Sequence, residues 1–96
     1  MVDVNWTKRA LKDIDNIAEF IAEDSFYYAQ VQVKRFFDKV EILKKYPTIG
    51  RVVPEKKQSN IREIILGNYR IIYKIISENK IDILTVHYSK RLLKNI

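Results

Sequence analysis

Residues 60–91 decide the fold, and they read NIREIIL (60–66), GN (67–68), YRIIYKII (69–76), SENK (77–80), IDILTVHY (81–88) and SKR (89–91). Three runs rich in isoleucine and tyrosine are separated by short breaks, the pattern of consecutive antiparallel strands. Gly67-Asn68 suits a two-residue hairpin turn because both residues tolerate a positive φ, and Glu78-Asn79 suits a looser turn of the same kind. We expect this meander to be the working surface. The polar side chains set into it or just beyond it are Arg62, Arg70, His87, Tyr88 and Arg91.

Two helices are predicted before the meander. Residues 2–6 alternate apolar and polar side chains, which indicates a short first strand. Thr7 then offers an N-cap for an amphipathic helix that ends near Glu23. Ser25 or Asp24 can cap a second helix. Because the link is so short, the two helices must pack as an antiparallel hairpin.

The second helix ends at Pro47, and residues 47–59 then read as a loop. The aromatic side chains of the second helix recur at helical spacing, so we expect them in the core rather than in a cofactor pocket. They are Phe26, Phe36 and Phe37. The apolar residues of the C-terminal tail could dock as a helical turn or as a final short strand. They are Leu92, Leu93 and Ile96.

The predicted fold is α+β, within one domain that covers residues 1–96. An N-terminal strand, a two-helix antiparallel hairpin and a three-stranded antiparallel meander form one sheet with the helices on one face. The apolar sides of the helices need that face. The opposite face, or its concave edge, is therefore left for function.

Composition excludes several classes of protein. The chain has no cysteine, so it holds neither a disulfide framework nor a thiolate metal site, and a single histidine argues against zinc. We expect neither a metal nor a cofactor. No basic, then apolar, leader begins the chain, and no apolar run approaches the ~18 residues of a membrane span. We therefore expect a cytoplasmic protein.

The positive charge lies in one half of the chain. Residues 1–48 carry eight basic and eight acidic side chains, whereas residues 49–96 carry ten and four and hold the whole excess of +6. A basic face of this kind favours anionic partners, either nucleic acid or an acidic protein segment. Arg51, Lys56 and Lys57 project from the loop beside the sheet and are candidates for such binding. They could equally be solvated loop charges.

Several segments together resemble the RelE/ParE toxin superfamily, and in particular its ParE-like, plasmid-stabilisation branch. They are Asp24-Ser25 between the helices, YPTIGRVVPE (46–55), IRE (61–63), GNYRIIY (67–73) and Val86-His87 followed by Arg91. The likeness covers essentially the whole chain in order. It implies the toxin of a type II toxin–antitoxin module, neutralised by a cognate antitoxin that wraps it with a segment disordered when free.

The superfamily has two classes of target, and the fold does not choose between them. RelE-type members cut messenger RNA on the ribosome without a metal, so the protein must supply a base, an acid and cations. The resemblance places Arg70 where these toxins hold a phosphate-stabilising arginine and Arg62 where they often have a basic residue. His87 and Tyr88 are chemically suited to be base and acid.

ParE-type members inhibit DNA gyrase by protein–protein contact and need no catalytic set. This class is favoured by the long apolar helix hairpin, the GRVVPE loop (50–55) and the spacing of His87 and Arg91. Asn60 and Ser89 stand where RelE-type chains tend to have basic residues. We therefore expect a gyrase-directed toxin, with Arg51, Lys56, Lys57 and Arg91 as the residues that bind the target or antitoxin. The alternatives are the ribonuclease and a non-toxic interaction module.

Structural roles are an alternative for the same side chains. Arg70 lies within a strand and could pair with Glu63 or Asp82, and Arg62 could form a cross-strand ion pair with Glu63. Tyr69 and Tyr73 share a face by the two-residue period of a strand, and we expect them in the core or at its rim.

Overall fold

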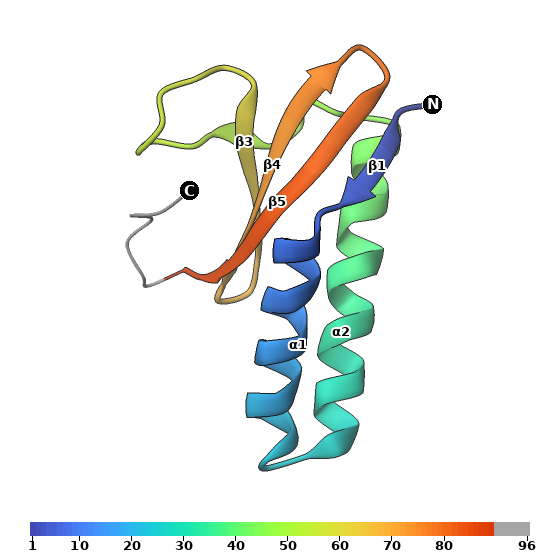
Figure 1. Ribbon diagram of the computed structural model, residues 1–96, viewed down its shortest axis with the longest axis vertical. Helices are drawn as coiled ribbons and strands as arrows, with labels where there is room; N and C mark the ends of the chain where they lie inside the picture. Colours follow the sequence, from blue (N-terminus) through green and yellow to red (C-terminus); the bar gives the residue numbers. More distant parts are fainter. Residues whose placement is uncertain (90–96) are drawn as a thin grey trace.

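A computed structural model describes residues 1–89 of the chain, and its elements run as one strand, two helices and four further strands (Figure 1). The elements are β1 (Asp3–Trp6), α1 (Lys8–Ala22), α2 (Phe26–Val40), the 3-10 helix η1 (Glu41–Lys44), β2 (Arg51–Val52), β3 (Ile61–Leu66), β4 (Tyr69–Ser77) and β5 (Lys80–Tyr88). The α+β class and the element order are those predicted. The one added element is the two-residue strand β2, which lies in the predicted loop.

Both helices begin at the predicted caps. The Thr7 hydroxyl accepts a hydrogen bond from the Ala10 backbone N–H at 3.2 Å, and the Ser25 hydroxyl accepts one from the Tyr28 N–H at 3.2 Å. Of the two candidate caps for α2, the structure therefore uses Ser25 rather than Asp24. The second helix continues through η1 before Pro47 turns the chain toward the sheet.

The sheet has the strand order β1-β5-β4-β3-β2. Strands β3, β4 and β5 form the predicted antiparallel meander, and β1 adds to it in parallel beside β5. In the turn between β3 and β4 Gly67 has a φ of 58°, the left-handed conformation that glycine adopts without steric cost. The neighbouring Asn68 is not in that region, so this turn needs a positive φ at its first residue alone.

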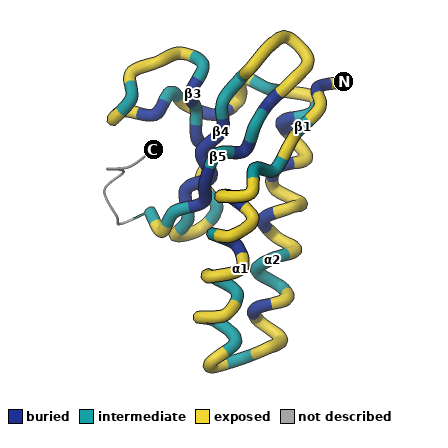
Figure 2. The backbone as a smooth tube through the Cα atoms, in the orientation of Figure 1, coloured by how far each residue is buried: buried dark blue, intermediate teal, exposed yellow. Residues whose placement is uncertain are grey.

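The two faces of the sheet bury different clusters. The helices cover one face, where Ile14 of α1 and Phe36 of α2 pack on strand residues such as Ile71 and Tyr73. On the opposite face a smaller cluster forms because Val53, from the loop after β2, packs against Ile61, Ile72 and Leu84. The face that we expected to be left for function is thus partly closed by residues that follow β2. Figure 2 shows the central strands mostly buried, with exposed residues on the hairpin and outer loops.

One prediction about the core is wrong. Phe36 is fully buried as expected, but Phe26 is 69% exposed. Phe37 is also partly exposed, and its ring contacts that of Trp6 in a tilted arrangement with centroids 4.7 Å apart. The physical reason is the length of the hairpin, whose far end extends beyond the sheet (Figure 1), so the first residue of α2 has no strand to pack against.

The tail residues Leu92, Leu93 and Ile96 lie outside the described residues. Among the helices of residues 1–89, none is both long and apolar enough to cross a membrane.

Candidate functional site

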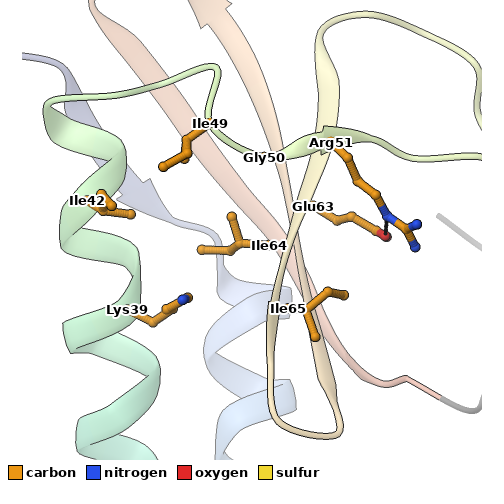
Figure 3. Close-up of a pocket in the computed structure, with 8 residues that line it drawn as sticks. All are labelled: Lys39, Ile42, Ile49, Gly50, Arg51, Glu63, Ile64 and Ile65. Atoms are coloured by element: carbon orange, nitrogen blue, oxygen red, sulfur yellow. Dashed lines mark hydrogen bonds and ion pairs between the residues drawn. The ribbon is translucent and has the colours of Figure 1, made fainter.

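A cluster of charged side chains lies on the sheet face opposite the helices. We call Arg51, Glu55, Glu63 and Arg70 the arginine–glutamate cluster. Glu63 is at its centre, with a side chain that is fully buried. Its Oε2 accepts a hydrogen bond from Nε of Arg51 (Figure 3), and its Oε1 accepts one from Nε of Arg70 at 2.7 Å. A buried carboxylate of this kind needs such partners, because taking its charge out of water is otherwise costly.

Arg70 is the second buried member of the cluster, with a side chain that is 8% exposed. Its guanidinium donates to Glu55 in a bidentate pair, from Nη1 to Oε2 at 2.9 Å and from Nη2 to Oε1 at 3.0 Å. Nη2 also donates to Glu63. All three nitrogens of Arg70 therefore donate to carboxylates of the chain itself.

These contacts shift the ionisation of the cluster. The pKa of Glu55 is about 2, below its ordinary value of 4.5, mainly because of the hydrogen bonds from Arg70, with a smaller contribution from the charge of Arg51. The bonds to Glu55, and then those to Glu63, raise the pKa of Arg70 although burial opposes this. The pair is therefore ionised across the physiological pH range.

The loop that carries Arg51 is pinned to the sheet by a buried tyrosine. The Tyr73 hydroxyl donates to the Pro47 carbonyl at 2.7 Å and accepts from the Gly50 N–H at 3.0 Å. A Cβ on Gly50 would lie 2.6 Å from the Glu63 carbonyl oxygen and 2.7 Å from the Tyr73 hydroxyl. Only glycine fits this approach, which explains the glycine of the GRVVPE loop in physical terms.

Arg62 holds the same loop from the other face of β3. Its guanidinium donates to three backbone carbonyls, those of Gly50 at 2.9 Å, Ser59 at 3.0 Å and Thr48 at 3.3 Å. The ion pair with Glu63 that was the structural alternative for Arg62 does not form, because adjacent residues of a strand point to opposite faces. Arg70, by contrast, pairs with Glu63 as its structural alternative predicted, whereas Asp82 accepts a hydrogen bond from Asn5 at 3.2 Å.

The four residues proposed for catalysis are divided between the two faces. Arg70 and His87 are register partners on β4 and β5, so they share the face of the arginine–glutamate cluster. Tyr88 follows His87 and points to the other face, where its ring packs edge-on against Tyr69 with centroids 5.9 Å apart. Arg62 also belongs to that other face. The structure thus brings together Arg70 and His87 but not the whole set.

Three of the four residues proposed to bind a target or antitoxin lie on β2 or in the loop that follows it. Arg51 belongs to the cluster, with a side chain that is 64% exposed. Lys56 and Lys57 follow Glu55, and Lys57 has a φ of 53°, a left-handed conformation unusual for lysine. Arg91 lies outside the described residues. In residues 1–89 no group of three histidine, aspartate or glutamate side chains is placed to hold a metal ion.

Two grooves lie beside these elements. One, of about 280 Å³, runs between α2 with η1 and the edge of β3, and Figure 3 shows Ile42, Ile49 and Ile64 directed into it, with Lys39 at one end. The other, of about 440 Å³, lies between α1 and α2 and is lined by Ala18, Ala22, Phe26, Ala29 and Val33 with polar residues at its rim.

Sequence reasoning missed an exposed aromatic group at the end of the hairpin. Its members are Phe20, Phe26, Tyr27 and Tyr28, each between 65% and 72% exposed. Tyr27 and Tyr28 contact each other edge-on with ring centroids 5.6 Å apart, and exposed apolar side chains of this kind are candidates for contact with a partner. Phe20 offered a signal, because it falls outside the apolar positions of the first helix; for Phe26 the pattern gave none, because helical spacing does not tell where the sheet ends.

Comparison with known proteins gives consistent matches. The family model for the ParE toxin of the type II toxin–antitoxin system parDE matches residues 4–93. "Putative toxin Y4kP" of Sinorhizobium fredii is 35% identical over 88 residues, covering 90% of this chain and 86% of that protein. "Toxin RelE2" of Caulobacter vibrioides is 27% identical over 92 residues, covering 96% of this chain and all of that protein.

The fold is also found in a solved structure. It is described as the chromosomal ParDE TA system from P. aeruginosa, and it aligns with a TM-score of 0.77 at 19% identity over 94% of this chain and 98% of that one. At this identity the likeness concerns the fold, which agrees with the two-helix hairpin and five-stranded sheet described above. From the match of the family model over residues 4–93, the chain belongs to the ParE toxin family of type II toxin–antitoxin systems.

Proposed function

We propose that this chain inhibits growth by binding DNA gyrase and that a cognate antitoxin neutralises it. The observation that supports a binding toxin most directly is the state of Arg70. All three of its nitrogens donate to Glu63 or Glu55, and its side chain is nearly buried. A toxin that acts by protein contact can use this arginine to hold the site in shape.

Cleavage of RNA would require the same side chains to leave their present partners. Attack by a 2′-hydroxyl on the adjacent phosphate requires a base, an acid and a cation whose donors are aimed at the developing charge. Arg70 would first have to leave two carboxylates, and Arg62 three carbonyls. Tyr88 would have to act from the opposite face to His87.

The ribonuclease remains the second candidate because Arg70 and His87 are register partners on the same face. One relative also carries the name "Toxin RelE2". In this case Arg62, Arg70, His87 and Tyr88 would act in metal-independent cleavage of messenger RNA on the ribosome. A third candidate is an interaction module that has the fold but no toxicity.

Binding of an antitoxin is supported by the exposed apolar surface. The aromatic group at the hairpin end and the apolar groove between the helices offer area that a partner chain could cover. The groove beside β3 offers a second place, because β2 pairs with only two residues of β3 and leaves the rest of that edge open.

The experiment is to express the chain without its antitoxin and to pulse-label DNA and protein synthesis within minutes of induction. A gyrase-directed toxin should stop DNA synthesis first, and the purified chain should inhibit supercoiling by purified gyrase. An early collapse of protein synthesis would instead support the ribonuclease and make Arg70 and His87 the first residues to mutate. If neither changes, only the interaction module would survive.

A further inference from the structure

Glu55 differs from the other members of the arginine–glutamate cluster in its origin. Arg51, Glu63 and Arg70 belong to strands, whereas Glu55 belongs to the loop between β2 and β3. We propose that the guanidinium groups of Arg70 and Arg51 form a carboxylate-binding site that Glu55 occupies in the free chain, and that a carboxylate of a partner protein takes its place. The choice of a protein as the partner rests on the proposed function.

The two guanidinium groups are held side by side by one residue. Arg51 donates to Oε2 of Glu63 and Arg70 donates to Oε1, so a single carboxylate binds both arginines. The two terminal nitrogens of Arg51 point away from Glu63 (Figure 3). They are not bonded to Glu63, so they can serve a second anion on the side of the cluster where Arg70 holds Glu55.

The base of the site is buried, whereas its present occupant is partly exposed. Glu63 and Arg70 have side chains that are 0% and 8% exposed, whereas that of Glu55 is 32% exposed. Glu55 sits in a turn closed by hydrogen bonds from the Lys56 and Lys57 N–H groups to the Val53 carbonyl. Lys57 is held there in a left-handed conformation that costs a residue with a side chain some energy.

The geometry indicates which anions the site would accept. Arg70 presents Nη1 and Nη2 in the parallel arrangement that matches the two oxygens of a carboxylate, and Glu55 already uses it in this way. The negative charge of Glu63 directly behind the guanidinium disfavours a dianion such as phosphate. The half of the chain that holds the site carries the whole net charge of +6, which attracts an acidic protein segment.

Tethering explains why a free carboxylate would not displace Glu55 by itself. A group attached through a short loop competes at an effective concentration of roughly millimolar or more. A partner that already contacts the grooves beside the sheet would present its own carboxylate at a similarly high effective concentration. The wild-type chain should therefore bind small carboxylates weakly, and removal of the Glu55 charge should open the site.

The test compares the wild-type chain with Glu55→Gln by titration with sodium acetate at pH 7 and constant ionic strength, followed through the NMR signals of the arginine Nε–H groups. We expect acetate to bind Glu55→Gln at least about tenfold more tightly than wild type, with the Arg70 signal shifting most. Adding Arg51→Met to Glu55→Gln should weaken that binding several-fold. The matched control is Glu78→Gln, which makes the same change in net charge in the exposed turn between β4 and β5 and should show no gain.

Three results would overturn the proposal. The first is a folded Glu55→Gln chain that gains no acetate binding, and the second is an equal gain in Glu78→Gln, which would indicate only general attraction. The third is inorganic phosphate binding at least tenfold more tightly than acetate, which would make the ligand a phosphate group. The assay contains no gyrase, so a chain that leaves gyrase active but binds acetate through Arg70 would remove the proposed target and keep the site.

Discussion

Replacement of Arg70 by methionine tests whether this arginine belongs to the fold or to a reaction. Methionine keeps much of the side-chain length but leaves Glu63 fully buried with one remaining partner, Arg51. Breaking a buried ion pair from one side costs about 3–5 kcal/mol, and we expect the lower end, about 3 kcal/mol, because Arg51 stays in place. For a domain of this size that corresponds to a fall of roughly 12–24 °C in the melting temperature.

The measurement is urea and thermal unfolding, followed by circular dichroism. The control is Arg51→Met, the same substitution in the other arginine bound to Glu63. Its side chain is 64% exposed and Arg70 still pairs with Glu63 in this variant, so its loss should cost less than the loss of Arg70. The double variant Arg70→Met with Glu63→Met should be more stable than Arg70→Met alone, because it removes the buried charge together with its partner.

This reasoning fails if Arg70→Met is less than about 1 kcal/mol below wild type, since a buried carboxylate would then have lost its partner at no cost. A variant that keeps its stability but no longer stops growth would show instead that Arg70 acts on the target. If the double variant folds and still inhibits growth, the guanidinium is needed for stability and not for toxicity.

Three further predictions concern the segment between the second helix and β3, which carries Gly50 and Glu55, and its contact with Tyr73. Gly50→Ala should destabilise by at least about 2 kcal/mol in urea unfolding, because the new Cβ meets the Glu63 carbonyl oxygen at 2.6 Å; a loss near zero would contradict that contact. Tyr73→Phe leaves the Gly50 N–H and the Pro47 carbonyl without a partner and should cost about 1–3 kcal/mol, measured the same way. The pKa of Glu55 is about 2 in the folded chain, so its charge stabilises the fold above about pH 5, and this stabilisation is lost as the pH falls toward 2. Glu55→Gln should remove about 1 kcal/mol of that acid dependence after allowance for solvent screening.

The elements were predictable because each has a local cause. The meander follows from isoleucine-rich runs and two short turns, and the helices follow from apolar periodicity and from caps at Thr7 and Ser25 that the structure confirms. The expected positions of Tyr69 and Tyr73 are also confirmed, since Tyr73 is fully buried and Tyr69 packs at the rim of the core. In each case the signal lies within a few residues of the element it predicts.

The arrangement of the site was not predictable in the same way. Glu63 and Arg70 lie on two strands joined by a two-residue turn. The hairpin alone was therefore enough to predict that they could form an ion pair. Glu55 is 15 residues from Arg70 in sequence, and its place depends on β2, which pairs Arg51 with Glu63 over only two residues. A strand this short leaves no periodic pattern in the sequence. The Tyr73 hydroxyl holds the preceding loop against the sheet, and residue spacing does not predict that hydrogen bond.

The length of the helix hairpin relative to the sheet was also hidden. Spacing identifies the apolar side of a helix, but burial depends on whether another element lies opposite each turn. Phe36 meets Tyr69 of β4 with ring centroids 5.1 Å apart, whereas Phe26, nearly three turns earlier, extends beyond the sheet. The same periodicity therefore contributes to the core at one end of α2 and leaves an exposed aromatic group at the other.

The arginine–glutamate cluster affects long-range attraction and short-range recognition of an acidic partner in different ways. Long-range attraction depends on net charge, and the pairs of Arg51 and Arg70 with Glu63 and Glu55 leave the total of +6 unchanged. Short-range recognition depends on donors that are not already engaged, and Arg70 has its nitrogens on internal carboxylates. An acidic partner would thus be attracted by the whole half of the chain, but would reach Arg70 only by displacing Glu55. Added salt should slow its association with wild type and with Glu55→Gln alike, whereas the substitution should mainly slow its dissociation.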